Sequence, residues 1–115
     1  MKVDYKDNSQ QVLSALEKGK RNALTAIGSS AETHTKDNIT ADKLVDTGRL
    51  RNSISHAVDG EAAYIGTNVE YAPYLELGTK KITAHHYLKR AVTEHKDEYK
   101  KLTAQAIQSA INNSQ

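Results

Sequence analysis

Histidine is the side chain of this sequence best suited to acid–base chemistry or metal binding, and it occurs five times, at His34, His56, His85, His86 and His95. The adjacent pair His85 and His86 would diverge on either a helix or a strand, so the two rings do not readily share a metal ion. We expect His56 and His95, which fall on apolar faces of their elements, to be partly buried and hydrogen-bonded. The spacing therefore supports no metal site, and only convergence of histidines in the folded chain would create one.

Two glutamates, Glu70 and Glu76, lie in the stretch that also holds two of the six tyrosines and the only proline. Their separation of six positions matches neither the three-or-four spacing of a helix face nor a reliable cross-strand pair, so an acid–base pair is not supported. We expect Glu76 to accept hydrogen bonds from a turn, or from Arg49 or Arg51, or to be held by its neighbours in a subunit interface.

The common catalytic and phosphate-binding motifs are missing from the sequence. It contains neither G-x-G nor G-K-[ST], and neither G-x-S-x-G nor H-E-x-x-H. It also contains no cysteine, which excludes disulfides, zinc–thiolate sites and thiol nucleophiles. We therefore expect a protein without enzymatic activity, with no catalytic residue, cofactor or metal.

Positive charge is concentrated in one stretch that contains Lys80, Lys81, His85, His86, Lys89 and Arg90. A charge run of this kind usually forms a solvated face, although it would also suit the wall of a pore through which nucleic acid passes. A small nucleic-acid-binding module that also uses Arg49 and Arg51 is an alternative. Sixteen basic residues against fourteen acidic ones give a net charge of only +2, which argues against that alternative.

The length of 115 residues fits one domain, residues 1–115. Only 37% of the residues are hydrophobic and every aromatic residue is tyrosine, so the core is thin and contacts with partners matter for stability. No apolar run approaches the ~20 residues that cross a bilayer, and the first ten residues lack the apolar core of a signal peptide. We expect a soluble protein that is made inside the cell and has no membrane partner.

The N-terminal half is expected to form a helix over about 9–32, followed by a loop over 33–48. The helix is predicted from apolar residues at three- and four-residue spacing, namely Val12, Leu13, Leu16, Ala23, Leu24 and Ile27. Gly28, Ser29 and Ser30 weaken the prediction of an unbroken helix. Asn, Asp and Thr dominate the loop, with room for a short helical turn over 40–45.

A β-hairpin over about 51–67 is predicted inside a sheet region of about 49–83. Ile54, His56 and Val58 alternate with small residues as in a half-buried strand, and Asp59-Gly60 follows at once. Asp-Gly between two alternating runs is typical of a two-residue type I′ turn, which needs positive φ at both central residues.

The C-terminal part is predicted to be a single amphipathic helix over about 86–112. Its apolar stripe contains Leu88, Ala91, Val92, His95, Tyr99, Leu102, Ala106, Ala110 and Ile111. The order of elements predicts an α+β fold, in which the N-terminal helix and the long C-terminal helix pack on one face of a small antiparallel sheet with a central hairpin.

Three segments together resemble one known family. They are DTGRLRNSI (46–54), GTNVEYAPYLELGT (66–79) and AHHYLKRA (84–91). They are similar to the D-T-G-x-L-x-x-S-I, G-[ST]-x-x-x-Y-A-x-x-[LV]-E-[FY]-G-T and A-R-P-F-L-x-P-A segments of small tailed-phage morphogenesis proteins, called neck or tail-completion proteins. Leu77 and Tyr87 stand where the family usually has Phe, and His85, His86 and Arg90 stand where Arg, Pro and Pro are common.

The resemblance implies a structural protein of a phage or prophage that acts at the head–tail junction of the virion. It implies assembly into a ring of identical subunits, hexameric or matched to the connector, made in the bacterial host cytoplasm. Its partners would be neighbouring head-completion and tail proteins, with transient passage of DNA. A closely related alternative is a tail terminator that caps the tail tube.

The residues of these segments have expected structural or interface roles. Gly48 and Gly78 suit tight turns or close backbone approach, and Pro73 suits a bend or an unpaired strand edge. Tyr71 and Leu75 are expected to complete the core, whereas Tyr74, Glu76 and the loop 33–47 are expected to contact other subunits. The remaining candidates for a structural or interface role are Leu50, Arg51 and Tyr87.

Overall fold

One long helix, α1 (Ser9–Asp42), organises the structure, a computed structural model that describes residues 9–44 and 47–113. The elements that follow are α2 (Thr47–Ser53), β1 (Ser55–Val58), β2 (Ala63–Gly66), α3 (Ala72–Leu77), α4 (Tyr87–Thr93) and α5 (Lys96–Asn113). Helix α1 contacts α2, both strands, α4 and α5. The two strands form an antiparallel hairpin, and the predicted α+β class is confirmed.

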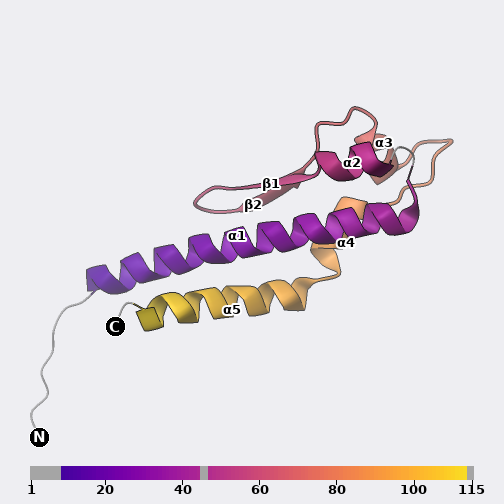
Figure 1. The fold of residues 1–115 in the computed structure, drawn as a ribbon. Coiled ribbons are helices and arrows are strands. Elements are labelled where there is room, and N and C mark those ends of the chain that lie inside the picture. The colour runs from indigo at the N-terminus through magenta and orange to yellow at the C-terminus, as the bar shows by residue number, and fades with distance from the viewer. Residues whose placement is uncertain (1–8, 45–46, 114–115) are drawn as a thin grey trace, which may run out of the picture.

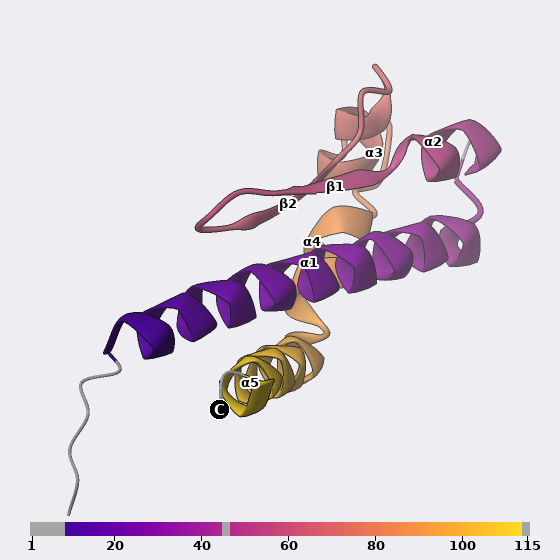
Figure 2. The same cartoon turned by 60° about the vertical axis from the view of Figure 1, so that its left-hand side comes forward.

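The hairpin and α5 lie on opposite sides of α1 (Figures 1 and 2). Helix α5 runs antiparallel to α1, since Gly19 lies beside Ile107 and Ala110 whereas Ser30 and His34 lie beside Glu98. Helix α1 therefore lies between α5 and the hairpin. We expected both helices to pack on one face of the sheet, but α5 packs on the side of α1 that faces away from it.

Helix α1 continues ten residues beyond its expected end at 32, so the predicted loop over 33–48 is wrong. Three threonines in this part satisfy their hydroxyls on the carbonyl four residues earlier, as in the bonds from Thr33 to Ser29, Thr35 to Ala31 and Thr40 to Lys36. Ile39, which is fully buried, adds a core contact. The helix ends at Asp42, and the next residue, Lys43, has a left-handed φ of 51°. The predicted short helical turn over 40–45 coincides at its start with the end of α1. Its last residue, Val45, lies outside the described residues.

Small residues line the buried face of α1, namely Ala15, Gly19, Ala23, Gly28, Ala31 and Thr35, followed by Ile39. A Cβ on Gly19 would lie 3.0 Å from the Cα of Ile107 in α5, and one on Gly28 would lie 2.8 Å from the ring of His56 in β1. Because both neighbours come this close, larger side chains do not fit between them. The predicted apolar stripe is therefore wrong at its start, where Val12, Leu13 and Leu16 are exposed.

The hairpin itself is confirmed, with Ser55 paired to Gly66 and Val58 paired to Ala63. His56 and Val58 are half-buried and alternate with exposed Ser55 and Ala57, as predicted. The predicted turn type is wrong, because neither Asp59 nor Gly60 has positive φ and the loop spans 59–62. Instead the Asp59 carboxylate accepts the backbone N–H groups of Glu61 (2.7 Å) and Ala62 (2.8 Å). These bonds hold the pKa of Asp59 below its usual range.

Helices interrupt the predicted sheet region over 49–83, which contains α2 and α3 besides the hairpin. The predicted single helix over 86–112 is divided into α4 and α5 at Glu94 and His95. At this break the hydroxyl of Tyr99 donates to the carbonyl of Ala91, which a continuous helix would use for the N–H of His95.

The larger apolar side chains gather at one end of the molecule, around the C-terminal end of α1. This core contains Ile39, Leu44, Leu50, Ile54, Val69, Ala72, Leu75 and Tyr87. It joins α1, α2, α3 and α4 and the loop before α3, so all three segments that resemble the phage family contribute to it. Asp46, the first residue of these segments, lies outside the described residues.

Replacement of Gly19 by leucine is expected to lower the free energy of unfolding by about 1–3 kcal/mol, because the side chain would overpack the contact between α1 and α5. Urea unfolding followed by circular dichroism measures this change. The control is Gly48→Ala in α2, where a Cβ meets nothing within 4 Å and stability should stay the same or rise by up to about 1 kcal/mol. Equal stability of Gly19→Leu and the unmodified chain would contradict the close packing of the two helices.

Candidate functional site at α3

The segment 66–79, one of the three that resemble the phage family, forms the loop after β2, the short helix α3 and the turn that follows it. Pro73 lies in the first turn of α3, with Tyr71 as the residue that caps it. The expected bend or strand edge for Pro73 is thus corrected to a helix start, where its missing N–H and fixed φ are tolerated best. Ala72 and Leu75 face the core, while Tyr74 and Leu77 face outward.

The carboxylate of Glu76 caps the N-terminus of α4. One of its oxygens accepts the backbone N–H of Leu88 (2.7 Å) and the other accepts that of Lys89 (3.2 Å). Both amides belong to the first turn of α4 and have no partner within the helix. Only 13% of the Glu76 side chain is exposed, so this residue joins two elements of one chain. This geometry matches one of the alternatives expected for Glu76, hydrogen bonds from a turn, here the first turn of α4. The expected contact of Glu76 with another subunit stays a prediction.

The two arginines proposed as alternative partners of Glu76 lie elsewhere. Arg49 pairs with Glu70 at 2.9 Å, and its guanidinium lies 5.5 Å from the centre of the Tyr71 ring. Glu70's own backbone N–H, followed by Arg49, lowers the pKa of Glu70. Arg51 is exposed on α2. The partly buried ring of Tyr71 packs against the core, as predicted.

The chain returns from α3 to α4 through a tight turn at Gly78. The carbonyls of Leu75 and Glu76 accept the N–H groups of His85 (2.8 Å) and His86 (3.2 Å). These bonds hold the segment before α4 against the end of α3. Gly78 has φ 80° and ψ 168°, a region that is essentially restricted to glycine, and a Cβ there would lie 2.9 Å from the nitrogen of Ala84. The expected role of Gly78 is confirmed. The expected tight turn or close backbone approach at Gly48 is wrong, because Gly48 lies within α2 and a Cβ there would meet nothing within 4 Å.

The turn into α4 differs from the proline-containing turn of the phage family. His86 caps α4 with a left-handed φ of 51°, whereas proline fixes φ near −65°. A proline is therefore incompatible with this backbone at position 86. The next residue, Tyr87, is fully buried and its hydroxyl donates to the carbonyl of Ala72 (2.8 Å). Burial, helped by the charge of Glu76, raises the pKa of Tyr87 to about 12. Tyr87 thus serves the core, as does the fully buried Leu50.

An exposed apolar surface remains on α3, formed by Tyr74 and Leu77, which are 55% and 71% exposed. We call these two residues the α3 patch. Beside it lies an open groove of about 430 Å³, lined mainly by apolar atoms of the loop over 66–70, of α3 and of Tyr87 and Leu88. An exposed leucine next to an apolar groove is a suitable surface for another protein to contact.

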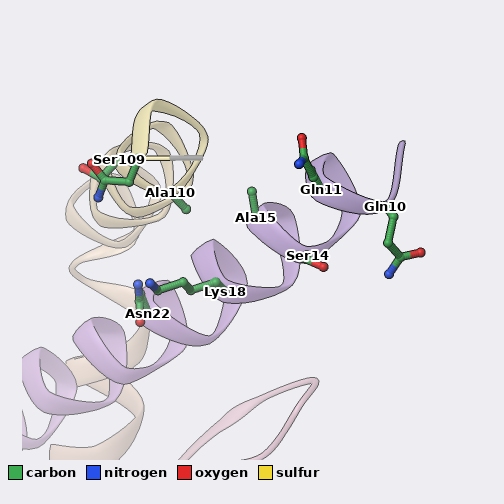
Figure 3. A pocket seen from close by; sticks show the side chains of 9 residues that line it. Gln10, Gln11, Ser14, Ala15, Lys18, Asn22, Ser109 and Ala110 are labelled. Carbon is green, nitrogen blue, oxygen red and sulfur yellow. The ribbon is translucent and has the colours of Figure 1, made fainter. Parts of the chain in front are cut away.

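A second exposed apolar surface lies near the start of α1 and consists of Val12, Leu13 and Leu16, of which Leu13 is 57% exposed. We call these residues the α1 patch. An open hollow of about 390 Å³ lies between α1 and α5 in the same part of the molecule, and none of the three α1-patch residues lines it. Figure 3 shows Ala15 and Ala110 facing this space, with Ser109 and Lys18 nearby. Small and polar residues line it, so it offers little apolar area by itself.

Acidic side chains lie next to three of the residues in the basic stretch. Asp42 lies 2.6 Å from Arg90 and 3.5 Å from His85, and Glu76 lies 3.7 Å from His86. His85 and His86 thus face different carboxylates, as their adjacency predicted. Lys80, Lys81 and Lys89 remain exposed.

The spacing of residues in the sequence did not predict that His34, His95 and Glu98 lie together in the folded chain. The bond between His34 and Glu98 joins positions 64 apart, a separation for which no local pattern gives a signal. The same holds for Asp42 and Arg90.

No protein-family model matches this chain, and comparisons with curated proteins and with solved structures find no similar protein. Within residues 9–44 and 47–113, no helix has the length and apolar character needed to span a membrane.

Removal of the Glu76 carboxylate by Glu76→Ala is expected to lower the free energy of unfolding by about 1–2 kcal/mol, the usual value of a helix cap. Thermal and urea unfolding measure the loss. Glu94→Ala is the matched control, since Glu94 is exposed and its side chain has no hydrogen bond within the described residues. A Glu76→Ala protein as stable as the control would show that the cap contributes nothing.

Gly78→Ala is expected to lose about 1–3 kcal/mol, because alanine would be strained at this φ and ψ and would clash with Ala84. Gly60→Ala, in the hairpin loop, has neither problem and should unfold within about 0.5 kcal/mol of the unmodified chain. Comparable unfolding midpoints for the two variants would refute the assigned turn.

Proposed function

We propose that this chain is a non-enzymatic structural protein of a tailed phage or prophage, which assembles as a ring at the head–tail junction of the virion. The observation that carries the proposal is the arrangement of the segment 66–79. Its buried side, Ala72 and Leu75, completes the core, and its outer side exposes the α3 patch. The resemblance to neck and tail-completion proteins supports the same function, since its three segments meet in one core with Leu50, Leu75 and Tyr87.

The two apolar patches lie in different parts of the molecule, which favours a ring. The α3 patch adjoins the core at the C-terminal end of α1, whereas the α1 patch lies near its N-terminal end, roughly 40 Å away along the helix axis. Contact between the α1 patch of one subunit and the α3 patch of the next is a head-to-tail interface, and such interfaces close into rings when the rotation permits.

The hairpin adds a second kind of contact surface. The sheet formed by the described residues has two strands, so the outer edges of β1 and β2 both lack a strand partner. An exposed edge offers backbone N–H and C=O groups to a strand from another chain. In the assembled junction this edge would bind a neighbouring subunit or a connector or tail protein.

The thin core makes assembly a source of stability as well as of function. Among the residues that the structure describes, eight buried ones form the main core. Burial of the α1 and α3 patches would add apolar area that the subunit alone leaves in water. The exposed Lys80, Lys81 and Lys89 would provide weak positive charge for passing DNA.

Light scattering after size exclusion, at several concentrations and two salt levels, is expected to show a ring-sized species or a concentration-dependent approach to it. Leu13→Asp and Leu77→Asp should each abolish the ring, because a buried, unpaired carboxylate opposes the contact. Val92→Asp, at an exposed position of α4 outside both patches, is the control and should assemble normally.

Mixing the two aspartate variants tests the head-to-tail arrangement. Each retains one intact patch, so the mixture should form dimers and no larger ring. If the unmodified chain stays monomeric both alone and with purified connector and tail-tube proteins, the proposal fails. Binding to the tail tube without binding to the connector would favour a tail terminator.

A further inference from the structure

Three potential metal ligands meet where α5 begins to pack on α1. His34 comes from α1, His95 from the break between α4 and α5, and Glu98 from the first turn of α5. One ligand atom of each lies within 4.8 Å of the others. Glu98 Oε2 is 2.7 Å from His34 Nε2 and 3.7 Å from His95 Nδ1. Ligands of a tetrahedral ion with bonds of about 2.0–2.1 Å are separated by similar distances.

The surroundings orient Glu98 toward the two histidines. Ser30 donates from its hydroxyl to Glu98 Oε1 at 2.7 Å, which leaves Oε2 on the histidine side. A hydrogen bond of this kind to the second oxygen is a common way to position a metal-binding carboxylate.

The histidine rings stack with centres 3.5 Å apart and planes 4° from parallel. The lone pairs of stacked rings lie in two separate parallel planes, so a shared ion requires the rings to rotate about χ2. Both side chains are partly exposed, which gives them room to turn. Neutral imidazole and carboxylate ligands together suit a borderline ion such as Zn²⁺ better than Mg²⁺ or Ca²⁺.

We propose that His34, His95 and Glu98 form a binding site for a divalent transition-metal ion of the Zn²⁺ class. The three ligands leave a fourth position for water or for a group from another molecule. A bound ion would join α1 to the beginning of α5, at a contact otherwise made by a hydrogen-bonded histidine and carboxylate. The ion would therefore stabilise the folded chain in proportion to its concentration. This inference is independent of the ring proposed above.

Calorimetric titration of Zn²⁺ into the untagged, chelator-treated full chain at neutral pH tests the site. We expect saturable binding of one ion per chain, no comparable binding of Mg²⁺, and visible d–d absorption with Co²⁺. His34→Gln, His95→Gln and Glu98→Gln should each weaken Zn²⁺ binding at least about tenfold. The His85→Gln/His86→Gln double variant removes as much imidazole elsewhere and should bind with unchanged affinity.

Thermal unfolding gives a second measurement. Zn²⁺ should raise the Tm of the unmodified chain and of the double variant, and should not raise that of His34→Gln or His95→Gln. Circular dichroism without metal shows which single variants remain folded, and the test uses those. Absence of saturable binding, equal affinity in the folded single variants, or loss of binding in the double variant would overturn the proposal.

Discussion

The close approach of α1 to its neighbours is the constraint on which the remaining structure depends. On one side α5 comes so near that a Cβ on Gly19 would lie only 3.0 Å from the Cα of Ile107, and on the other side a Cβ on Gly28 would lie 2.8 Å from the ring of His56 in β1. Dispersion contacts between backbones and small side chains thus replace the interlocking of large apolar side chains in this part of the molecule. A protein with no Phe or Trp fills its interior by bringing helices closer together. The large apolar residues near the start of α1 are consequently left on the surface.

A single carboxylate connects two of the three segments that resemble the phage family. Glu76 belongs to the second segment and caps the helix that carries the third, while Tyr87 of the third segment bonds back to Ala72 of the second. These contacts run in both directions between α3 and α4, and they fix the outward orientation of Tyr74 and Leu77. The chain keeps an aromatic residue at the buried position 87 and has leucine at the exposed position 77. The aromatic side chain thus lies at the buried position, where its volume fills the core.

Local sequence patterns predicted the elements whose structure depends on nearby residues. The hairpin followed from alternation around His56, and Gly78 was identified as a position where a Cβ would obstruct the backbone. The helix over 33–42 was not predicted, because Asn and Thr favour turns unless hydroxyls such as that of Thr35 bond to the preceding turn and tertiary contacts hold the helix. The turn at Asp59 was assigned the wrong type because its side chain closes a longer loop.

Contacts between distant positions account for what the sequence left open in the site. The break before α5 depends on the Tyr99 hydroxyl, and the cap of α4 on a residue twelve positions before Leu88. No helical or strand period links such positions. That Glu76 binds backbone amides was one of several alternatives, and the packing of α3 against α4 selects it. The meeting of His34 with His95 depends in the same way on how α5 folds back along α1.

The uneven distribution of large apolar residues divides the molecule energetically. The core at the C-terminal end of α1 joins four helices, whereas the other end is held mainly by contacts of α1 with α5 around Ala15, Gly19 and Ala110. Because α5 follows a break in the helix, its separation from α1 would break the bond from the Tyr99 hydroxyl to Ala91 but leave the contacts of α4 with α1 and α3 in place. The amides of α5 and of the first turns of α1 would then exchange with solvent through a local opening of low free energy, while those around Tyr87 exchange only on global unfolding. We therefore expect the two ends to behave as separate cooperative units within one small chain.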